Sequence, residues 1–261
     1  MKRLLFVSLL AACGGSAAKP TGPVAPKAPA GPVVYTTAEQ VIEAGIAAEG
    51  GRAKLATVTS LHTIGSINIP QLGAPGTFET FGTPPNNSLM RFEAKGLIKE
   101  EAGVTGDIAW EKNTMMGARI LTGPERSMAL VEATFHGDLE WKRLYPKAQL
   151  KGTVKFADVD CYQVELTTAD GQAQTRYYAK DTLLPIGLEM VAVSPMGKVP
   201  VKVVNSDWRP DGGMLSPHKI TREEAGQPLT IVIEKVEVNT PIPPATFELS
   251  DEIKQLAAAR K

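Results

Sequence analysis

The chain has 261 residues and a mass of 27.8 kDa, enough for one sizeable domain or one domain with an appendage. Hydrophobic residues make up 43% and charged residues 21%, which excludes a multi-span membrane protein, a fully disordered chain and a coiled coil. The 28 Lys and Arg balance the 28 Asp and Glu, so the basic excess of nucleic-acid-binding proteins is missing. We therefore expect a folded protein without a nucleic-acid partner.

The N-terminus has the features of a bacterial export signal. Two basic residues follow Met1, residues 4–10 are apolar except for one serine, and two alanines precede Cys13. This stretch is much shorter than the ~20 apolar residues that span a bilayer, so we interpret residues 1–12 as a signal peptide. Its last residues with the cysteine, Leu-Ala-Ala-Cys, resemble the lipobox of bacterial lipoproteins.

The lipobox resemblance implies cleavage before Cys13 and acylation of its sulfur, with palmitate among the chains. Each buried acyl methylene adds about 0.8 kcal/mol, so two or three chains would form a stable membrane anchor. Gly14 is not the aspartate associated with inner-membrane retention, which favours the outer membrane of a Gram-negative bacterium and a periplasm-facing protein. The alternative is a cysteine that merely ends an ordinary signal peptide.

Residues 13–35 lack apolar periodicity and carry a proline at every third position. These are Pro20, Pro23, Pro26, Pro29 and Pro32. Polyproline II has three residues per turn, so this composition predicts a stiff tether that holds the following domain off the membrane. A ligand for a proline-recognition module is the alternative. We place the start of the folded domain near Thr36, so that it spans residues 36–261.

The first element expected in this domain is a helix. A capping box is available in two registers, Thr36 with Glu39 or Thr37 with Gln40. An apolar repeat follows and a Gly-Gly pair ends it. A short helical turn is expected over 52–56. Strand-like runs bounded by turn residues then cover 60–69, 76–83, 89–101 and 106–112.

A second helix is expected to begin at Gly123-Pro124, because proline is tolerated in the first turn. One apolar stripe follows at spacings of 3, 4 and 4: Met128, Val131, Phe135 and Leu139. Gly137 and Pro146 are the expected breaks. This pattern predicts an inserted helix midway through a chain that is otherwise composed of strands.

The rest of the chain reads as β-strands. Asp170-Gly171 predicts a hairpin, and a two-residue turn centred on it pairs Glu165 with Arg176. Asp211-Gly212 marks a further turn. The apolar residues change parity near Glu234, which predicts a β-bulge or bend.

About ten antiparallel strands with two helices predict a mainly β (α+β) domain. We expect one strongly curved sheet that forms an unclosed barrel, with the helices packed on its concave side. With Cys13 acylated, Cys161 has no intramolecular partner, so no disulfide is expected to stabilise the fold. Its strand context indicates a small buried hydrophobe rather than a reactive thiol.

Several of these segments are similar to bacterial proteins of the outer-membrane lipoprotein-sorting type, related to the lipoprotein carrier and receptor of the Lol pathway. The similar positions are Gly50-Gly51, Leu55, Val58, Ser60 and Gly65, the run from Gly106 to Glu111 with Gly117, Leu121 and Gly123, and Val236 to Asn239 with Ile242, Pro243 and Phe247. The resemblance covers residues 37–250. It implies an unclosed β-barrel with a helical lid over a hydrophobic cavity that holds acyl chains.

The usual marks of catalysis are missing from the sequence. The three histidines, His62, His136 and His218, do not form a spaced metal pair, and there is no Gly-x-Ser-x-Gly elbow, phosphate-binding glycine loop or dinucleotide fingerprint. The paired carboxylates Glu100-Glu101 and Glu223-Glu224 are interpreted as solvated rims. We therefore expect no enzymatic activity, no metal and no cofactor.

The leading hypothesis is a lipid-anchored, monomeric envelope protein that binds lipid or a lipoprotein's acyl chains without catalysis. Its candidate cavity residues are Phe78, Phe81, Trp110, Met128, Val131, Phe135, Leu139 and Trp141. An acyl chain needs only a dry, shaped apolar wall. The alternative is a structural or assembly lipoprotein with a filled core, whose sheet is a platform for protein interactions.

Overall fold

The computed structural model describes residues 34–70, 73, 75–94, 96–194 and 197–259. The predicted signal peptide, Cys13 and all but the last two residues of the predicted tether lie outside the described residues. Within the described part of the chain, no helix is long and apolar enough to cross a membrane.

The domain begins with two helices, α1 (Ala38–Ala48) and α2 (Arg52–Leu55). Of the two predicted capping boxes, the structure contains the second: the Gln40 amide donates to Thr37 Oγ1 at 3.2 Å, and the Gln40 side chain accepts from the Thr37 amide. Gly51, with φ of +86°, precedes α2. The predicted helix and helical turn are both confirmed.

Thirteen strands within the described residues form one antiparallel sheet. We call β1–β6 the N-terminal arm and β7–β13 the C-terminal arm. The N-terminal arm contains β1 (Leu61–Asn68), β2 (Pro75–Thr83), β3 (Asn87–Ala94), β4 (Ile98–Thr105), β5 (Ile108–Asn113) and β6 (Gly117–Ile120). The C-terminal arm contains β7 (Lys147–Phe156), β8 (Val159–Thr167), β9 (Ala173–Ala179), β10 (Pro185–Ser194), β11 (Gly197–Asp211), β12 (Met214–Glu224) and β13 (Gln227–Val238).

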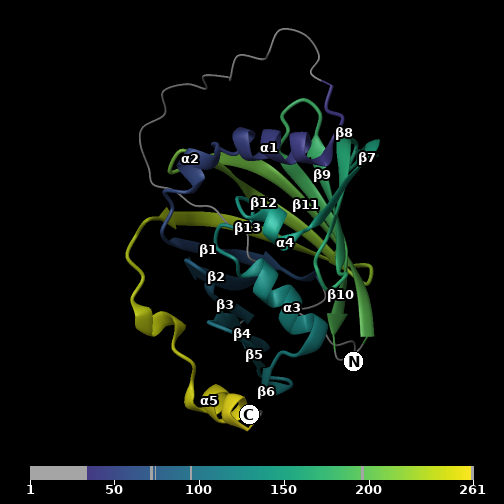
Figure 1. Ribbon diagram of the computed structural model, residues 1–261. Coiled ribbons are helices and arrows are strands. Elements are labelled where there is room, and N and C mark those ends of the chain that lie inside the picture. Colours follow the sequence, from purple (N-terminus) through teal and green to yellow (C-terminus); the bar gives the residue numbers. More distant parts are fainter. Residues whose placement is uncertain (1–33, 71–72, 74, 95, 195–196, 260–261) are drawn as a thin grey trace.

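Each arm is a meander of neighbouring strands, and the two arms are joined where β1 pairs with β13. The free edges are therefore β6 and β7, and the sheet curves without closing (Figure 1). This is the unclosed barrel that the sequence predicts. One expectation was wrong in detail, because residues 89–101 form parts of two strands, β3 and β4, rather than one.

The β-bulge predicted near Glu234 is confirmed. Ile64 pairs with Lys235, while Gly65 pairs with Ile233, so Glu234 is the extra residue. Gly65 lies at this point because the sheet is crowded there. A Cβ on Gly65 would lie 2.1 Å from the Val232 carbonyl oxygen. The bulge bends the sheet at the junction of its two arms.

The hairpin between β8 and β9 has a different register from the predicted one. Glu165 pairs with Thr175 rather than with Arg176. The reason is a three-residue loop centred on Asp170, closed by hydrogen bonds between Thr168 and Gln172. A longer loop shifts every pair by one residue, so Arg176 lies opposite Val164 on the other face.

A lower cluster of apolar side chains lines the inner face across both arms. It includes Ile67, Phe78, Met90, Phe92, Val201, Val203, Ile220 and Ile231. After β13 the chain continues outside the sheet through a 3-10 helix, η2 (Pro244–Phe247), and α5 (Asp251–Ala258) (Figure 1). These contribute Phe247 and Ile253 to an outer cluster with Leu89 and Trp110.

Candidate functional site

Residues 121–146 connect β6 to β7, the two free edges of the sheet. We call them the lid segment; they contain α3 (Gly123–Glu132) and α4 (Trp141–Leu144). α3 contacts β4 and β5 of one arm and β10 of the other. In Figure 1, α1, α4 and α3 lie one below another between the two arms. The lid segment therefore covers the opening of the barrel.

The apolar stripe predicted for one helix is divided in the structure. Met128 and Val131 lie on α3, and Phe135 and Leu139 follow it. The helix ends at Glu132, and the Phe135 amide donates instead to the Pro85 carbonyl at 3.0 Å. This hydrogen bond ties the lid segment to the turn between β2 and β3. The second helix thus begins where the sequence predicts and ends earlier than the predicted apolar stripe.

Glu43 on α1 holds the other end of the lid segment. Trp141 Nε1 donates to Glu43 Oε1 at 2.9 Å, and Arg52 Nε donates to Glu43 Oε2 at 2.7 Å. Arg52 Nη1 also donates to the Leu139 carbonyl at 3.0 Å. The hydrogen bond from Arg52 lowers the pKa of Glu43, together with that from Trp141 and against the effect of burial. Glu43 therefore remains ionised and couples α1, α2 and α4.

A partly buried ion pair fixes the middle of the lid segment. Arg176 on β9 donates to Asp138 Oδ1 at 2.7 Å, and its guanidinium lies 5.6 Å from the centre of the Tyr145 ring. Strand β9 of the C-terminal arm is thereby joined to the lid segment by an ion pair. The lid segment is closed in this structure.

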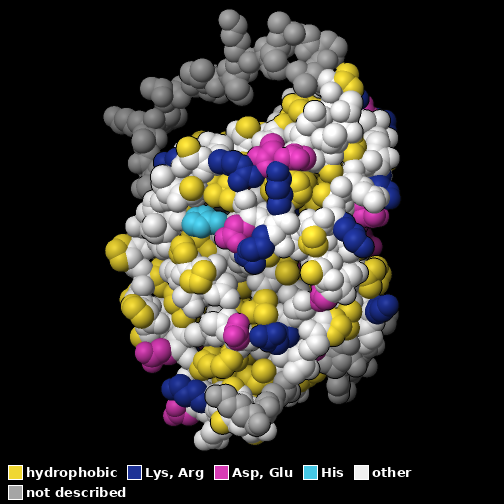
Figure 2. Space-filling view, viewed as in Figure 1, with side chains coloured by type: hydrophobic (Ala, Val, Ile, Leu, Met, Phe, Trp, Pro, Cys, Tyr) yellow, Lys and Arg dark blue, Asp and Glu magenta, His cyan; other side chains and the backbone are white. Residues whose placement is uncertain are grey.

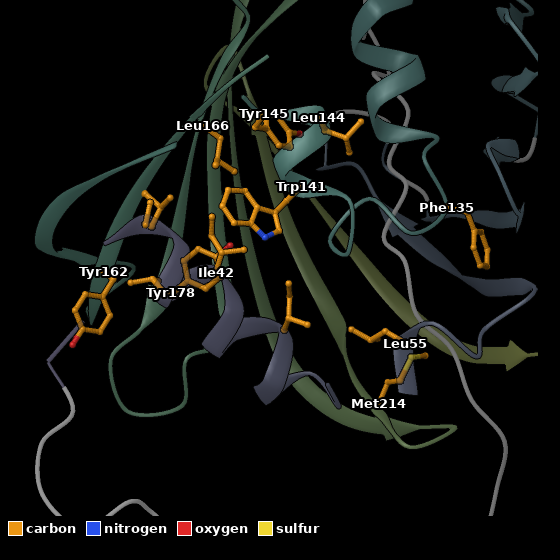
Figure 3. Close-up of a cluster of buried hydrophobic side chains, with 14 of the residues drawn as sticks. Ile42, Leu55, Phe135, Trp141, Leu144, Tyr145, Tyr162, Leu166, Tyr178 and Met214 are labelled. Carbon is orange, nitrogen blue, oxygen red and sulfur yellow. The ribbon is translucent and has the colours of Figure 1, made fainter. Parts of the chain in front are cut away.

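An upper cluster of apolar side chains lies beneath α1 and α4. It includes Ile42, Leu55, Phe135, Trp141, Leu144, Tyr145, Tyr162, Leu166, Tyr178 and Met214. Trp141 points from α4 toward Ile42 on α1 (Figure 3). A cavity of about 30 Å³ borders this cluster between Met214 and the lid residues Phe135 to Leu139. That volume has room for about two water molecules and is far below the 300–1,000 Å³ of typical ligand pockets.

The eight predicted cavity residues are divided among three clusters. Phe135 and Trp141 belong to the upper cluster, and Val131 and Leu139 pack against it. Phe78 belongs to the lower cluster, and Met128 packs against it. Trp110 instead belongs to the outer cluster, which contains side chains of η2 and α5, and Phe81 packs against that cluster. The structure thus brings six of the eight to the covered side of the sheet. The other two are covered by the segment after β13. The alternation of apolar residues along the strands does not indicate that this segment packs against the outside of the sheet.

Two larger hollows lie at the surface. One, of about 560 Å³, is lined by Glu39, Glu43, Arg52, Leu139, Glu140, Lys142 and Arg143. Opposite charges lie side by side over α1 and α4 in Figure 2. Lys142 pairs with Glu39, and Arg143 pairs with Glu140. The other, of about 480 Å³, lies between β5, β6 and α5, with mostly apolar walls that include Ile108, Ile120, Leu121 and Leu249.

The histidines occupy three different environments. His62 lies between Glu79 and Glu237, at 2.7 Å from each, and His136 Nε2 lies 3.0 Å from the Val58 carbonyl oxygen. His218 Nε2 lies 2.7 Å from Asp211 Oδ2, and Ser216 donates to the same carboxylate oxygen. Because the serine bonds to the aspartate and not to the histidine, this is not the nucleophile–base order of a hydrolase triad.

No set of three His, Cys, Asp or Glu side chains within the described residues is arranged to hold a metal ion. Cys161 is fully buried, burial raises the pKa of its thiol, and Sγ lies 3.3 Å from the Val159 carbonyl oxygen. This agrees with the predicted buried hydrophobe. The solvated-rim interpretation of the carboxylate pairs is wrong for Glu100, which is only 4% exposed, and for Glu224, whose side chain is 11% exposed.

No protein-family model and no curated protein matches this chain. Several solved structures match its fold. The LolA superfamily protein NE2245 from Nitrosomonas europaea has 16% identity and a TM-score of 0.56, over 82% of this chain and 99% of that one. A DUF1329 family protein from Desulfovibrio piger has 16% identity and a TM-score of 0.55, over 81% and 97%.

A domain named for outer membrane lipoprotein sorting, from Vibrio parahaemolyticus, has 10% identity and a TM-score of 0.55, over 81% of this chain and 97% of that one. At such identities the likeness shows the fold. The structural resemblance that the sequence indicated is therefore confirmed at the level of the fold: this chain shares its open-barrel fold with these three structures.

Proposed function

We propose that this protein binds lipid, or the acyl chains of a lipoprotein, inside its open barrel when the lid segment moves. The observation that carries the proposal is the covered opening: both free edges of the sheet are joined by one segment whose buried side is apolar. Binding requires no catalysis. The acyl chain would leave water, displace part of the upper cluster and be released to a receiving site with a larger or drier cavity.

The fold of the three similar proteins supports this proposal, since two of them are named for the LolA superfamily or for lipoprotein sorting. We further propose that residues 1–12 are a signal peptide and that acylated Cys13 and the tether hold residues 36–261 at the outer membrane, facing the periplasm. The protein would act there as a monomer. These assignments rest on the sequence patterns described above.

The small cavity favours a second candidate function. A cavity of only about 30 Å³ beside the upper cluster is also what a structural or assembly lipoprotein with a filled core would have. In that case the protein would use its surface, including the 480 Å³ hollow between β5, β6 and α5, to bind another protein. The two candidates differ in whether the lid segment opens for an acyl chain.

Titration of the Cys13→Ser chain with a fatty acid or a nonionic detergent below its micelle concentration separates them. We expect saturable binding with a change in tryptophan emission, because Trp141 must change its surroundings when the lid segment moves. Phe135→Asp should weaken binding at least tenfold, since it buries a charge where the alkyl chain must lie.

Leu97→Asp is the matched control, because Leu97 is exposed in the turn between β3 and β4. It should leave binding unchanged. If neither amphiphile binds saturably to a folded chain, the lipid-binding proposal fails and the assembly platform takes its place.

A further inference from the structure

The apolar hollow of about 480 Å³ lies at the surface, where the lid segment begins. Three parts of the chain that are distant in sequence form it: β5 with β6, the first residues of the lid segment, and α5 with the residue Leu249 before it. Its volume is within the range of ligand pockets, whereas that of the cavity beside the upper cluster is far below it.

The hollow exists because of the side chains that α5 presents to β6. Ile253 and Ala257 lie one helical turn apart, so they are on the same side of α5. Ile253 is fully buried in the outer cluster, whereas Ala257 only packs against this cluster and lines the hollow. A methyl group therefore stands where a longer side chain would fill the space between α5, Ile120 and Leu121.

The walls of the hollow are held in place by contacts outside it. Thr105 Oγ1 on β4 donates to the Phe247 carbonyl at 2.8 Å, and Lys112 on β5 donates to Glu252 on α5 at 2.6 Å. Together with the buried Ile253, these contacts place α5 beside β6 (Figure 1). The hollow is therefore preformed, and a ligand does not have to order α5 when it binds.

One side of the rim carries a guanidinium group. Arg126 Nε donates to the Asp107 carbonyl at 3.0 Å, which orients the group. Its two Nη atoms make no hydrogen bond with the residues that the structure describes, and the Asp107 carboxylate is 3.9 Å from Nη2. The Asp107 side chain is 92% exposed, so water screens its charge. Arg126 is thus able to offer two parallel N–H donors to a carboxylate.

A second cation lies on the α5 side of the rim. Lys254 lines the hollow, and its Nζ lies 3.4 Å from Asp251 Oδ1, with both side chains exposed. An exposed pair of this kind contributes little to stability, so Lys254 can turn to another anion at little cost. The hollow therefore combines apolar walls with two cations and one screened carboxylate at its rim.

We propose that this hollow binds a fatty acid, with its alkyl chain against Ile120, Leu121 and Ala257 and its carboxylate paired with Arg126 and Lys254. An alkyl chain suits these walls because it has no polar groups to satisfy. A peptide would instead bury backbone N–H and C=O groups against apolar side chains that offer no partners. The site lies apart from the upper cluster, and its occupation does not require the lid segment to open.

The test uses the full chain carrying Cys13→Ser, with Trp141 and Trp208 replaced by phenylalanine so that only Trp110 emits. Trp110 pairs in register with Ile120, which lines the hollow. A fatty acid with bromine along its alkyl chain, added below its micelle concentration, should therefore quench Trp110 saturably. It should bind at least about tenfold more tightly than the brominated alcohol of the same length, the usual effect of a hydrogen bond to a charged group.

Calorimetry on the chain that keeps all three tryptophans measures the same preference with unbrominated dodecanoate and dodecanol. Arg126→Gln/Lys254→Gln should remove the preference for the carboxylate. Ala257→Leu should weaken the binding of both compounds, because it fills the hollow. The matched control is Lys198→Gln/Lys219→Gln, which removes two exposed cations from β11 and β12 and should change neither affinity.

The outcomes separate this inference from the proposed function. A folded chain whose Trp110 is not quenched, or a carboxylate preference that survives Arg126→Gln/Lys254→Gln, would overturn the inference and leave the hollow as a surface for a protein partner. If the brominated fatty acid quenches Trp141 in the chain that keeps only that tryptophan, while Trp110 stays unquenched, the inference fails and the proposed function stands. Quenching of Trp110 without quenching of Trp141 would support the inference and contradict the proposed function.

Discussion

Replacing Glu100 by glutamine should make the protein more stable at alkaline pH, and the effect should depend on pH. Glu100 is 4% exposed, and burial raises its pKa from 4.5 to about 8. In the unfolded chain its carboxyl ionises near pH 4.5, whereas in the folded chain it keeps its proton until about pH 8. Raising the pH across this window therefore favours the unfolded state.

The size of the effect follows from the shift. Each pH unit corresponds to 1.36 kcal/mol, so full ionisation opposes folding by at most about 5 kcal/mol. A glutamine has no proton to lose and keeps the shape of the neutral acid. The stability advantage of Glu100→Gln should therefore be smallest near pH 4, grow by about 1.4 kcal/mol per unit between pH 5 and pH 7.5, and level off above pH 8.

Urea unfolding at half-unit steps from pH 4 to pH 9 measures this difference directly. Glu101→Gln is the control, because its exposed ion pair with Arg91 is worth at most about 1 kcal/mol. If the free energies of unfolding of Glu100→Gln and of the unaltered protein differ by a constant at all pH values, the raised pKa of Glu100 is refuted.

Three further predictions concern other parts of the chain. Cys13→Ser should abolish palmitate labelling and membrane fractionation in a bacterium, and labelling that survives would refute the lipobox. The melting temperature should be the same with and without reductant, because Cys161 is buried and free; a large drop on reduction would reveal an intermolecular disulfide. Gly65→Ala should lower the free energy of unfolding by about 2 kcal/mol because of overpacking. Gly82→Ala, whose Cβ would lie 3.4 Å from Phe135, should lower it far less. Equal losses of stability in the two variants would contradict the crowding at the bulge.

The sequence was most informative where structure is decided locally. The capping box at Thr37, the turn after Asp211 and the bulge at Glu234 each depend on a few neighbouring residues, and all three are present. The overall architecture followed from the number of strands and turns. The hairpin register near Asp170 was missed because a dipeptide signal does not distinguish a two-residue loop from a three-residue one.

The interior was harder to predict, since it depends on contacts between distant segments. Alternation places Glu100 and Glu101 on opposite faces but does not say which face is covered. The end of α3 depends on a hydrogen bond from Phe135 to Pro85, some fifty residues away in the chain. Trp110 belongs to the outer cluster only because η2 and α5 return across the outside of the sheet, which no local pattern indicates.

The central claim is that an alkyl chain enters beneath the lid segment. Trp141 reports on this directly once Trp110 and Trp208 are replaced by phenylalanine, because it is 4% exposed and lies within the upper cluster. The measurement is a titration with a single-chain amphiphile that carries bromine along its alkyl chain, since bromine quenches an indole only near contact. The account predicts saturable quenching of Trp141 at one amphiphile per chain, abolished by an excess of the unbrominated compound. Emission that remains unquenched while the protein stays folded would contradict it.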